Sequence, residues 1–241
     1  MAAPVVILCG GQGTRIRGHA GDLPKALVPI GDRPIVEHVI ELYAAQGYDE
    51  FMLAAGHRAE ALERWSLSAP ARGVSVTVID TGELTETGGR VAALAPRLRG
   101  RGPFHLTYAD GLADIDLRNL EDAHRAGEAL ATVTLVRPEL QFGVAQLGPG
   151  DRITGFSEKP RSQQWINGGF MLLEEAALDF FKPDSVLERD VLPSLADAGA
   201  LRGERHEGFW RCMDTYKDAL ALDELCRRGG PPWLATAPTP A

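Results

Sequence analysis

Short apolar segments alternate with longer amphipathic segments through the first half of the chain. Five short segments are rich in branched and aromatic side chains, as is typical of buried strands: residues 5–9, 50–56, 74–80, 104–109 and 130–136. Four segments between them repeat apolar positions every three to four residues and predict helices: residues 34–47, 58–65, 90–98 and 116–127. This order predicts an α/β fold with a doubly wound, mostly parallel, Rossmann-like sheet that is covered on both faces.

The pattern changes after residue 141. Residues 142–160 predict a hairpin around a Gly-Pro-Gly-Asp turn at 148–151, which would form a small β-rich appendage. Residues 200–215 predict extended chain, and residues 215–229 predict a closing helix. Because no linker or repeat divides the chain, we expect one domain over residues 1–230. Residues 231–241 are rich in proline and alanine, and we expect a poorly ordered tail there.

Composition narrows the class of protein. The net charge of −8 argues against a general binder of nucleic acid or of membrane surfaces. The three cysteines are widely spaced and read as reduced thiols, and no signal segment or spanning apolar run stands out. We therefore expect a cytoplasmic protein that binds neither nucleic acid nor membrane.

Three loops follow predicted strands, at residues 10–15, 81–90 and 108–111. In an open α/β sheet, ligands bind beyond the carboxyl ends of the strands, so these loops should face one crevice. The first loop carries Gly10, Gly11 and Gly13, whose backbone amides suit phosphate oxygens, and Arg15 and Lys25 follow with positive charge. It matches neither the dinucleotide fingerprint nor the P-loop. The sequence therefore predicts a different kind of nucleotide-phosphate site.

Residues 5–35 resemble the signature of the sugar-1-phosphate nucleotidyltransferases, GGxGTRxx…PKxLxPIxxxPI. Four further segments of the family recur in the expected order: YADG, SEKP, INGGF and MDT. The segments DTGELTETGGR and GFWRCMDTYKD resemble most closely the glucose-1-phosphate cytidylyltransferase branch. The chain departs from that branch in PKALVPI, where PKPMVEI is usual, and in YADG, where YGDG is usual.

The resemblance implies a nucleotide-diphospho-sugar transferase fold and transfer of a nucleotidyl group, CMP from CTP in this branch, to a hexose 1-phosphate. Glucose 1-phosphate would give CDP-glucose and pyrophosphate. It implies catalytic roles for Arg15, Lys25 and Asp110, and Mg²⁺ held by Asp110 and Asp214. It assigns the nucleotide to Leu8, Gly10, Gly11, Gly13, Thr14, Thr87, Gly88, Gly89 and Arg90. The sugar phosphate and sugar would contact Glu158, Lys159, Asn167 and Gly168, partly on the appendage. It also implies a homo-oligomer.

Several alternatives stay open at this point. Asp110 and Asp214 can equally serve as helix caps or turn residues, and Arg90 as a solvated arginine in a first helical turn. The same chemistry fits a heptose or other sugar 1-phosphate with ATP, dTTP or GTP as donor. A non-catalytic nucleotide-sugar sensor would keep the fold, although such a protein is expected to lose the charged residues that are present here.

Overall fold

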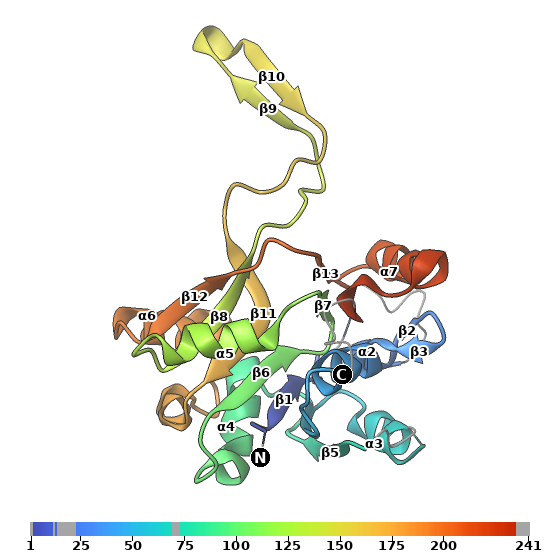
Figure 1. Ribbon diagram of the computed structural model, residues 1–241, viewed down its shortest axis with the longest axis vertical. Coiled ribbons are helices and arrows are strands. Elements are labelled where there is room, and N and C mark those ends of the chain that lie inside the picture. The colour runs from blue at the N-terminus through green and yellow to red at the C-terminus, as the bar shows by residue number, and fades with distance from the viewer. Residues whose placement is uncertain (1, 12, 14–22, 69–72, 235–241) are drawn as a thin grey trace.

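A seven-stranded sheet forms the centre of the computed structural model, which describes residues 2–11, 13, 23–68 and 73–234 (Figure 1). The strand order is β12-β8-β11-β6-β1-β4-β5. Strand β11 runs antiparallel to both of its neighbours, and the other neighbouring pairs are parallel. The strands are β1 Val5–Leu8, β4 Glu50–Ala55, β5 Ser75–Asp80, β6 Phe104–Tyr108, β8 Ala131–Val136, β11 Ile166–Leu173 and β12 Leu201–Arg205. The predicted mostly parallel α/β sheet is confirmed.

The helices cover both faces of this sheet. They are α2 Ile35–Ala44, α3 Ala59–Ser68, α4 Thr87–Leu98, α5 Leu117–Arg125, α6 Leu192–Asp197 and α7 Tyr216–Gly229. Short helical turns lie at η1 Lys25–Leu27, η2 Pro149–Asp151, η3 Glu175–Phe180, η4 Leu187–Val191 and η5 Pro232–Leu234. None of the helices in the described part of the chain is long and apolar enough to span a membrane.

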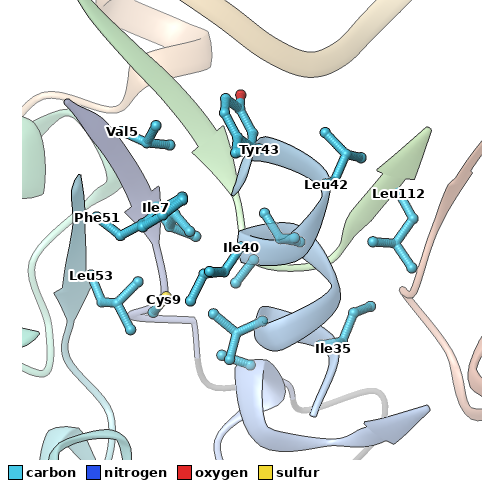
Figure 2. Packing of buried hydrophobic residues seen from close by; sticks show 14 of the residues in the cluster. Val5, Ile7, Cys9, Ile35, Ile40, Leu42, Tyr43, Phe51, Leu53 and Leu112 are labelled. Carbon is cyan, nitrogen blue, oxygen red and sulfur yellow. The ribbon is translucent and has the colours of Figure 1, made fainter. Parts of the chain in front are cut away.

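The alternation of side chains along β1 divides the core into two clusters. Val5 and Ile7 belong to the cluster beneath α2 and α7, whereas Val6 and Leu8 belong to the cluster beneath α4 and α6. Figure 2 shows Ile7 and the aromatic ring of Phe51 in the first cluster beside α2. Fully burying one such side chain stabilises the fold by about 1.5–3 kcal/mol. Because β1 is buried on both faces, it is apolar throughout and holds the loop that follows it in place.

Two short strand pairs complete the edge where the loops meet. Strand β13 (Trp210–Cys212) pairs antiparallel with β7 (Gly111–Ala113), which follows directly after β6. The pair β2 (Pro29–Ile30) and β3 (Arg33–Pro34) precedes α2. The β7–β13 pair brings the end of the predicted extended segment back to the carboxyl end of the central strand β6.

The predicted hairpin forms an arm that projects far from the sheet (Figure 1). It consists of β9 (Val144–Leu147) and β10 (Ile153–Ser157), which pair antiparallel. Its large apolar side chains face solvent: Phe142, Leu147, Ile153 and Phe156 are 60–80% exposed. The arm therefore has no core of its own on which these side chains pack.

The end of the described chain differs from the expected tail. The Trp233 side chain is only 1% exposed and lies against the rings of His38 and Phe209. The proline- and alanine-rich composition hides this anchor, because a single indole can bury enough apolar surface to hold a short turn. Residues 235–241 of the predicted tail lie outside the described residues.

Residues 187–197 form two successive helical segments. A π-helical turn, η4, comes first, and α6 follows with Pro193 near its start. Proline has no backbone N–H, so it cannot continue the regular hydrogen-bond pattern through this point. Glu188 therefore lies in the π-helical turn η4. π-Helical turns often occur near functional sites.

Candidate active site

Two aspartates and a lysine from three distant segments meet at the carboxyl edge of the sheet. Asp110 follows β6, Asp214 follows β13, and Lys25 begins η1. Lys25 Nζ donates to Asp110 Oδ2 at 2.5 Å and to Asp214 Oδ1 at 3.0 Å. The backbone N–H of Met213 donates to the Asp110 carbonyl at 2.8 Å and so fixes the two carboxylates beside each other.

The two aspartates of this cluster keep Lys25 positively charged. Burial alone would lower the pKa of Lys25, but the charge and hydrogen bonds of Asp110, with Asp214, outweigh burial and raise it. Lys25 is therefore a cation at neutral pH. Its ammonium lies between two carboxylates at a partly buried position, where charge interactions are stronger than in bulk water.

Cys212 completes a group that could hold a metal ion. One ligand atom each from Asp110, Cys212 and Asp214 lies within 4.8 Å of the others. Burial and the neighbouring aspartates raise the pKa of the Cys212 thiol, so it stays protonated. A thiol sulfur is a soft ligand, whereas carboxylate oxygens suit hard cations. The donor set thus fits a hard divalent cation bound through the two aspartates.

A pocket of about 220 Å³ opens beside this cluster. Its lining comes from the loop after β1, from η1, from the start of α4 and from the end of β6. The lining residues are Leu8, Cys9, Gly11, Gly13, Lys25, Ala26, Thr87, Tyr108, Ala109, Asp110 and Asp214. The structure therefore brings residues of all three predicted loops together with Lys25 and Asp214.

The Thr87-Gly88-Gly89 segment lies in the first turn of α4 rather than in a loop. Gly89 N–H donates to the Ser185 carbonyl at 3.0 Å, and Leu187 N–H donates to Thr87 Oγ1 at 2.9 Å. A Cβ on Gly89 would lie 2.2 Å from the Pro183 carbonyl oxygen. Close packing thus explains both the helix and its glycines, and their contact with a nucleotide stays a prediction.

Arg90 has a different environment from the one expected. Its side chain is 4% exposed, and the guanidinium donates to Thr81 Oγ1 and to the backbone carbonyls of Ala55, Gly82, Gly10 and Glu83. It is neither a solvated arginine nor a member of the pocket lining. The geometry therefore gives it supporting contacts with the loops, and its contact with a nucleotide stays a prediction.

Glu188 and Trp210 are polar neighbours of the site; the sequence does not point to Glu188, and it fits Trp210 equally to the core or to a wall of the active site. The Tyr108 hydroxyl donates to Glu188, and Thr87 Oγ1 also donates to Glu188, at 3.0 Å. The Trp210 indole N–H donates to the Gly168 carbonyl at 2.7 Å. No short motif marks these contacts, because their partners lie far apart in the sequence.

The predicted sugar-site residues occupy two places. Asn167 and Gly168 lie on β11, where Asn167 Nδ2 donates to the Tyr108 hydroxyl at 3.3 Å, next to the pocket wall. Glu158 and Lys159 lie at the base of the arm, exposed and outside the described lining of the pocket. Thr14 and Arg15 lie outside the described residues.

Comparison with known proteins agrees with this arrangement. The family model described as nucleotidyl transferase matches residues 4–217. A glucose-1-phosphate cytidylyltransferase of Salmonella typhimurium strain LT2 is 32% identical, over 95% of this chain and 97% of its own. A probable glucose-1-phosphate cytidylyltransferase of Bacillus subtilis strain 168 is 35% identical, over 95% and 98%.

The fold is similar to that of a solved putative glucose-1-phosphate thymidylyltransferase from Bacillus anthracis. The TM-score is 0.72 at 19% identity, over 94% of this chain and 96% of the other. The match of the family model spans the glycine loop, the Lys25–Asp110–Asp214 cluster and the strands that position them. This chain belongs to the nucleotidyl transferase family and, within it, to the sugar-1-phosphate nucleotidyltransferases.

Proposed function

We propose that this protein transfers CMP from CTP to glucose 1-phosphate and releases CDP-glucose and pyrophosphate. The observation that carries the proposal is the cluster of Lys25, Asp110 and Asp214 beside a glycine-lined pocket. The choice of CTP and glucose 1-phosphate as substrates is supported by the two cytidylyltransferase relatives, which match nearly the whole chain.

The chemistry requires positioning and charge more than proton transfer. An oxygen of the sugar phosphate attacks the α-phosphorus of CTP in line, and pyrophosphate leaves from the opposite side. The attacking oxygen is already an anion near neutral pH, so no strong general base is needed. Catalysis then depends on holding two anions together and on stabilising charge in the transition state.

Lys25 is suited to stabilise the reacting phosphate. Its ammonium lines the pocket next to Asp110, and the raised pKa keeps it charged. The glycine loop contributes backbone donors, since Gly11 and Gly13 line the same pocket and have no side chains to keep a phosphate away. Arg15 and Thr14 are proposed to act on the outer phosphates from the same loop.

Asp110 and Asp214 would hold Mg²⁺, the cation that their hard oxygen ligands fit. A cation held there would supply neutralisation of phosphate charge. The fixed backbone contact between Met213 and Asp110 keeps the two carboxylates in register for this role.

The sugar is proposed to lie toward β11. Asn167 donates a hydrogen bond to Tyr108, which lines the pocket, and the Trp210 indole donates to the carbonyl of the neighbouring Gly168. Glu158 and Lys159 are proposed to reach the sugar phosphate from the base of the arm. Leu8, Thr87, Gly88 and Gly89 are proposed to shape the nucleotide side.

The test is a matrix of nucleotides and sugars. Pyrophosphate release is measured with CTP, ATP, GTP, UTP and dTTP against glucose 1-phosphate, mannose 1-phosphate and a heptose 1-phosphate, with Mg²⁺. We expect turnover to be fastest for CTP with glucose 1-phosphate, with CDP-glucose identified by mass spectrometry. Fastest turnover with another pair would replace these substrates, and binding without turnover of any pair would favour the sensor alternative.

A further inference from the structure

Arg90 is a buried cation that joins three separate loops at the carboxyl edge of the sheet. It is the fourth residue of α4, and its side chain points toward the ends of β1, β4 and β5. These are the strand ends beyond which an α/β sheet binds its ligand.

The contacts of the guanidinium are distributed over all three loops. Nη1 donates to the Ala55 carbonyl at 2.8 Å, to Thr81 Oγ1 at 2.6 Å and to the Gly82 carbonyl at 2.9 Å. Nη2 donates to the Gly10 carbonyl at 3.3 Å and to the Glu83 carbonyl at 3.4 Å. Only the planar, forked arrangement of donors in arginine can serve acceptors spread in this way.

The surrounding backbone leaves space for this group and no more. A Cβ added to Gly10 would lie 1.9 Å from Arg90 Cζ, and one added to Gly56 would lie 2.3 Å from Nη1. Glycine at both positions is therefore required by the guanidinium. For Gly10, this reason is independent of any contact with phosphate.

No carboxylate forms an ion pair with Arg90 among the described residues, and its neighbours are neutral oxygens. Burying a cation costs free energy, and burial lowers the pKa of Arg90, although the charges of Asp80 and Glu86 oppose this shift without a direct ion pair. Arg90 thus places positive charge behind the glycine loop, where it favours an anionic ligand.

We propose that Arg90 is a positioning residue that fixes the glycine loop relative to the loops after β4 and β5 and so sets the shape of the nucleotide pocket. This inference rests on the proposed function only for the identity of the nucleotide. The fixed relation of the three loops is a property of the protein without any ligand.

The test compares Arg90→Lys with the parent protein and with Arg99→Lys. Arg99 follows the same helix, is exposed and pairs with Asp179, so its substitution is the matched control. Hydrogen–deuterium exchange is measured without ligand. We expect Arg90→Lys to accelerate exchange in residues 9–11, 55–57 and 81–86 while β11 and α7 stay unchanged, and Arg99→Lys to leave all of these segments unchanged.

Kinetics provide the second readout. Misplacement of a binding site by about 1 Å can cost about 10²-fold, so we expect a loss of that order in kcat/KM for CTP, with KM for CTP rising more than KM for the sugar phosphate. Unchanged exchange in the three loops, or a uniform increase over the whole chain, would overturn the positioning role. An enzyme that shows the loop effect but turns over another nucleotide would change the proposed function and leave this inference intact.

A second variant covers failure of Arg90→Lys to fold. Gly56→Ala leaves Arg90 in the sequence but places a methyl group where the guanidinium lies. We expect it to give the same local pattern of exchange. Protection of all three loops equal to that of the parent would contradict the proposal.

Discussion

At the residue scale, the proposed chemistry depends on Lys25 and on the two aspartates that bind its ammonium. The amino-acid sequence led to Asp110 through its place at a strand end, and to Asp214 only through resemblance to a family. Their spacing in the sequence does not show that the two aspartates lie side by side, because the pairing of β7 with β13 brings them together. Glu188 was missed for the same reason, since its partners Tyr108 and Thr87 are brought to it by tertiary packing.

Removing one carboxylate charge should stop the reaction without unfolding the protein. We expect Asp110→Asn and Asp214→Asn each to lower the rate of Mg²⁺-dependent pyrophosphate release by about 10²–10³-fold, as for other charge-stabilising groups. The melting temperature of each variant shows whether the fold survives. Asp122→Asn, on the exposed surface of α5, is the matched control and should keep full activity. Wild-type turnover in either active-site variant would disprove the metal assignment.

Lys25→Met tests the cation of the same cluster. The substitution keeps much of the side-chain volume but removes the charge, and leaves Asp110 and Asp214 next to each other without their partner. We expect kcat to fall by about 10²–10³-fold. Measurement of kcat at saturating concentrations of both substrates checks this, and a change confined to KM would contradict a role in the transition state.

At the element scale, the strands could be predicted well because their apolar runs are short and sharply ended. The start of α4 could not, because glycine disfavours a helix interior and the Thr-Gly-Gly segment reads as a loop. Packing against residues 183–187 overrides that preference. Likewise, the hairpin could be predicted from its turn, but its projection away from the sheet depends on contacts that the local sequence does not describe.

The close packing of α4 predicts a large effect for a single methyl group. Gly89→Ala places a Cβ against the Pro183 carbonyl, so one of the two backbones must shift. We expect the free energy of unfolding to fall by about 1–3 kcal/mol, measured by urea denaturation. Gly229→Ala, where a Cβ meets no other atom, is the control and should stay within about 0.5 kcal/mol of the parent. Equal stability of both variants would contradict this packing.

Strand β6 buries a histidine that should make stability depend on pH. His105 is fully buried, and neither ring nitrogen has a hydrogen-bond partner among the described residues. Burial lowers its pKa, although Glu121 nearby opposes the shift. The unfolded chain therefore takes up a proton at higher pH than the folded chain does. The contribution of neutral His105 is present above about pH 6.5, the unperturbed pKa of histidine, and is lost as the pH falls below it.

A non-titrating side chain at this position isolates the effect. The free energy of unfolding is measured at several pH values between 7.5 and 5 for the parent and for His105→Gln. We expect the parent to lose more stability than the variant as the pH falls, because other groups contribute equally to both. Identical pH dependence in the two proteins would show that His105 takes up no fewer protons when folded.

At the scale of the whole molecule, we propose that the arm takes part in self-association. The resemblance predicts a homo-oligomer, and the arm, which projects from the sheet in Figure 1, has Phe142 and Phe156 exposed to solvent. We expect the parent protein to sediment as an oligomer and the double variant Phe142→Ser and Phe156→Ser to dissociate, with little change in melting temperature. Leu67→Ser removes an equally exposed apolar residue from α3 as the control. A monomeric parent, or an oligomer unaffected by the double variant, would contradict this role.

The whole molecule is proposed to perform one reaction, so its product provides the most direct test. The purified protein is incubated with CTP, glucose 1-phosphate and Mg²⁺, and both pyrophosphate and the nucleotide sugar are measured over time. We expect equal amounts of pyrophosphate and CDP-glucose from the parent, and both to form about 10²–10³-fold more slowly with Asp110→Asn. Absence of CDP-glucose with the folded parent protein, or its formation by Asp110→Asn at the parent rate, would contradict the proposed reaction.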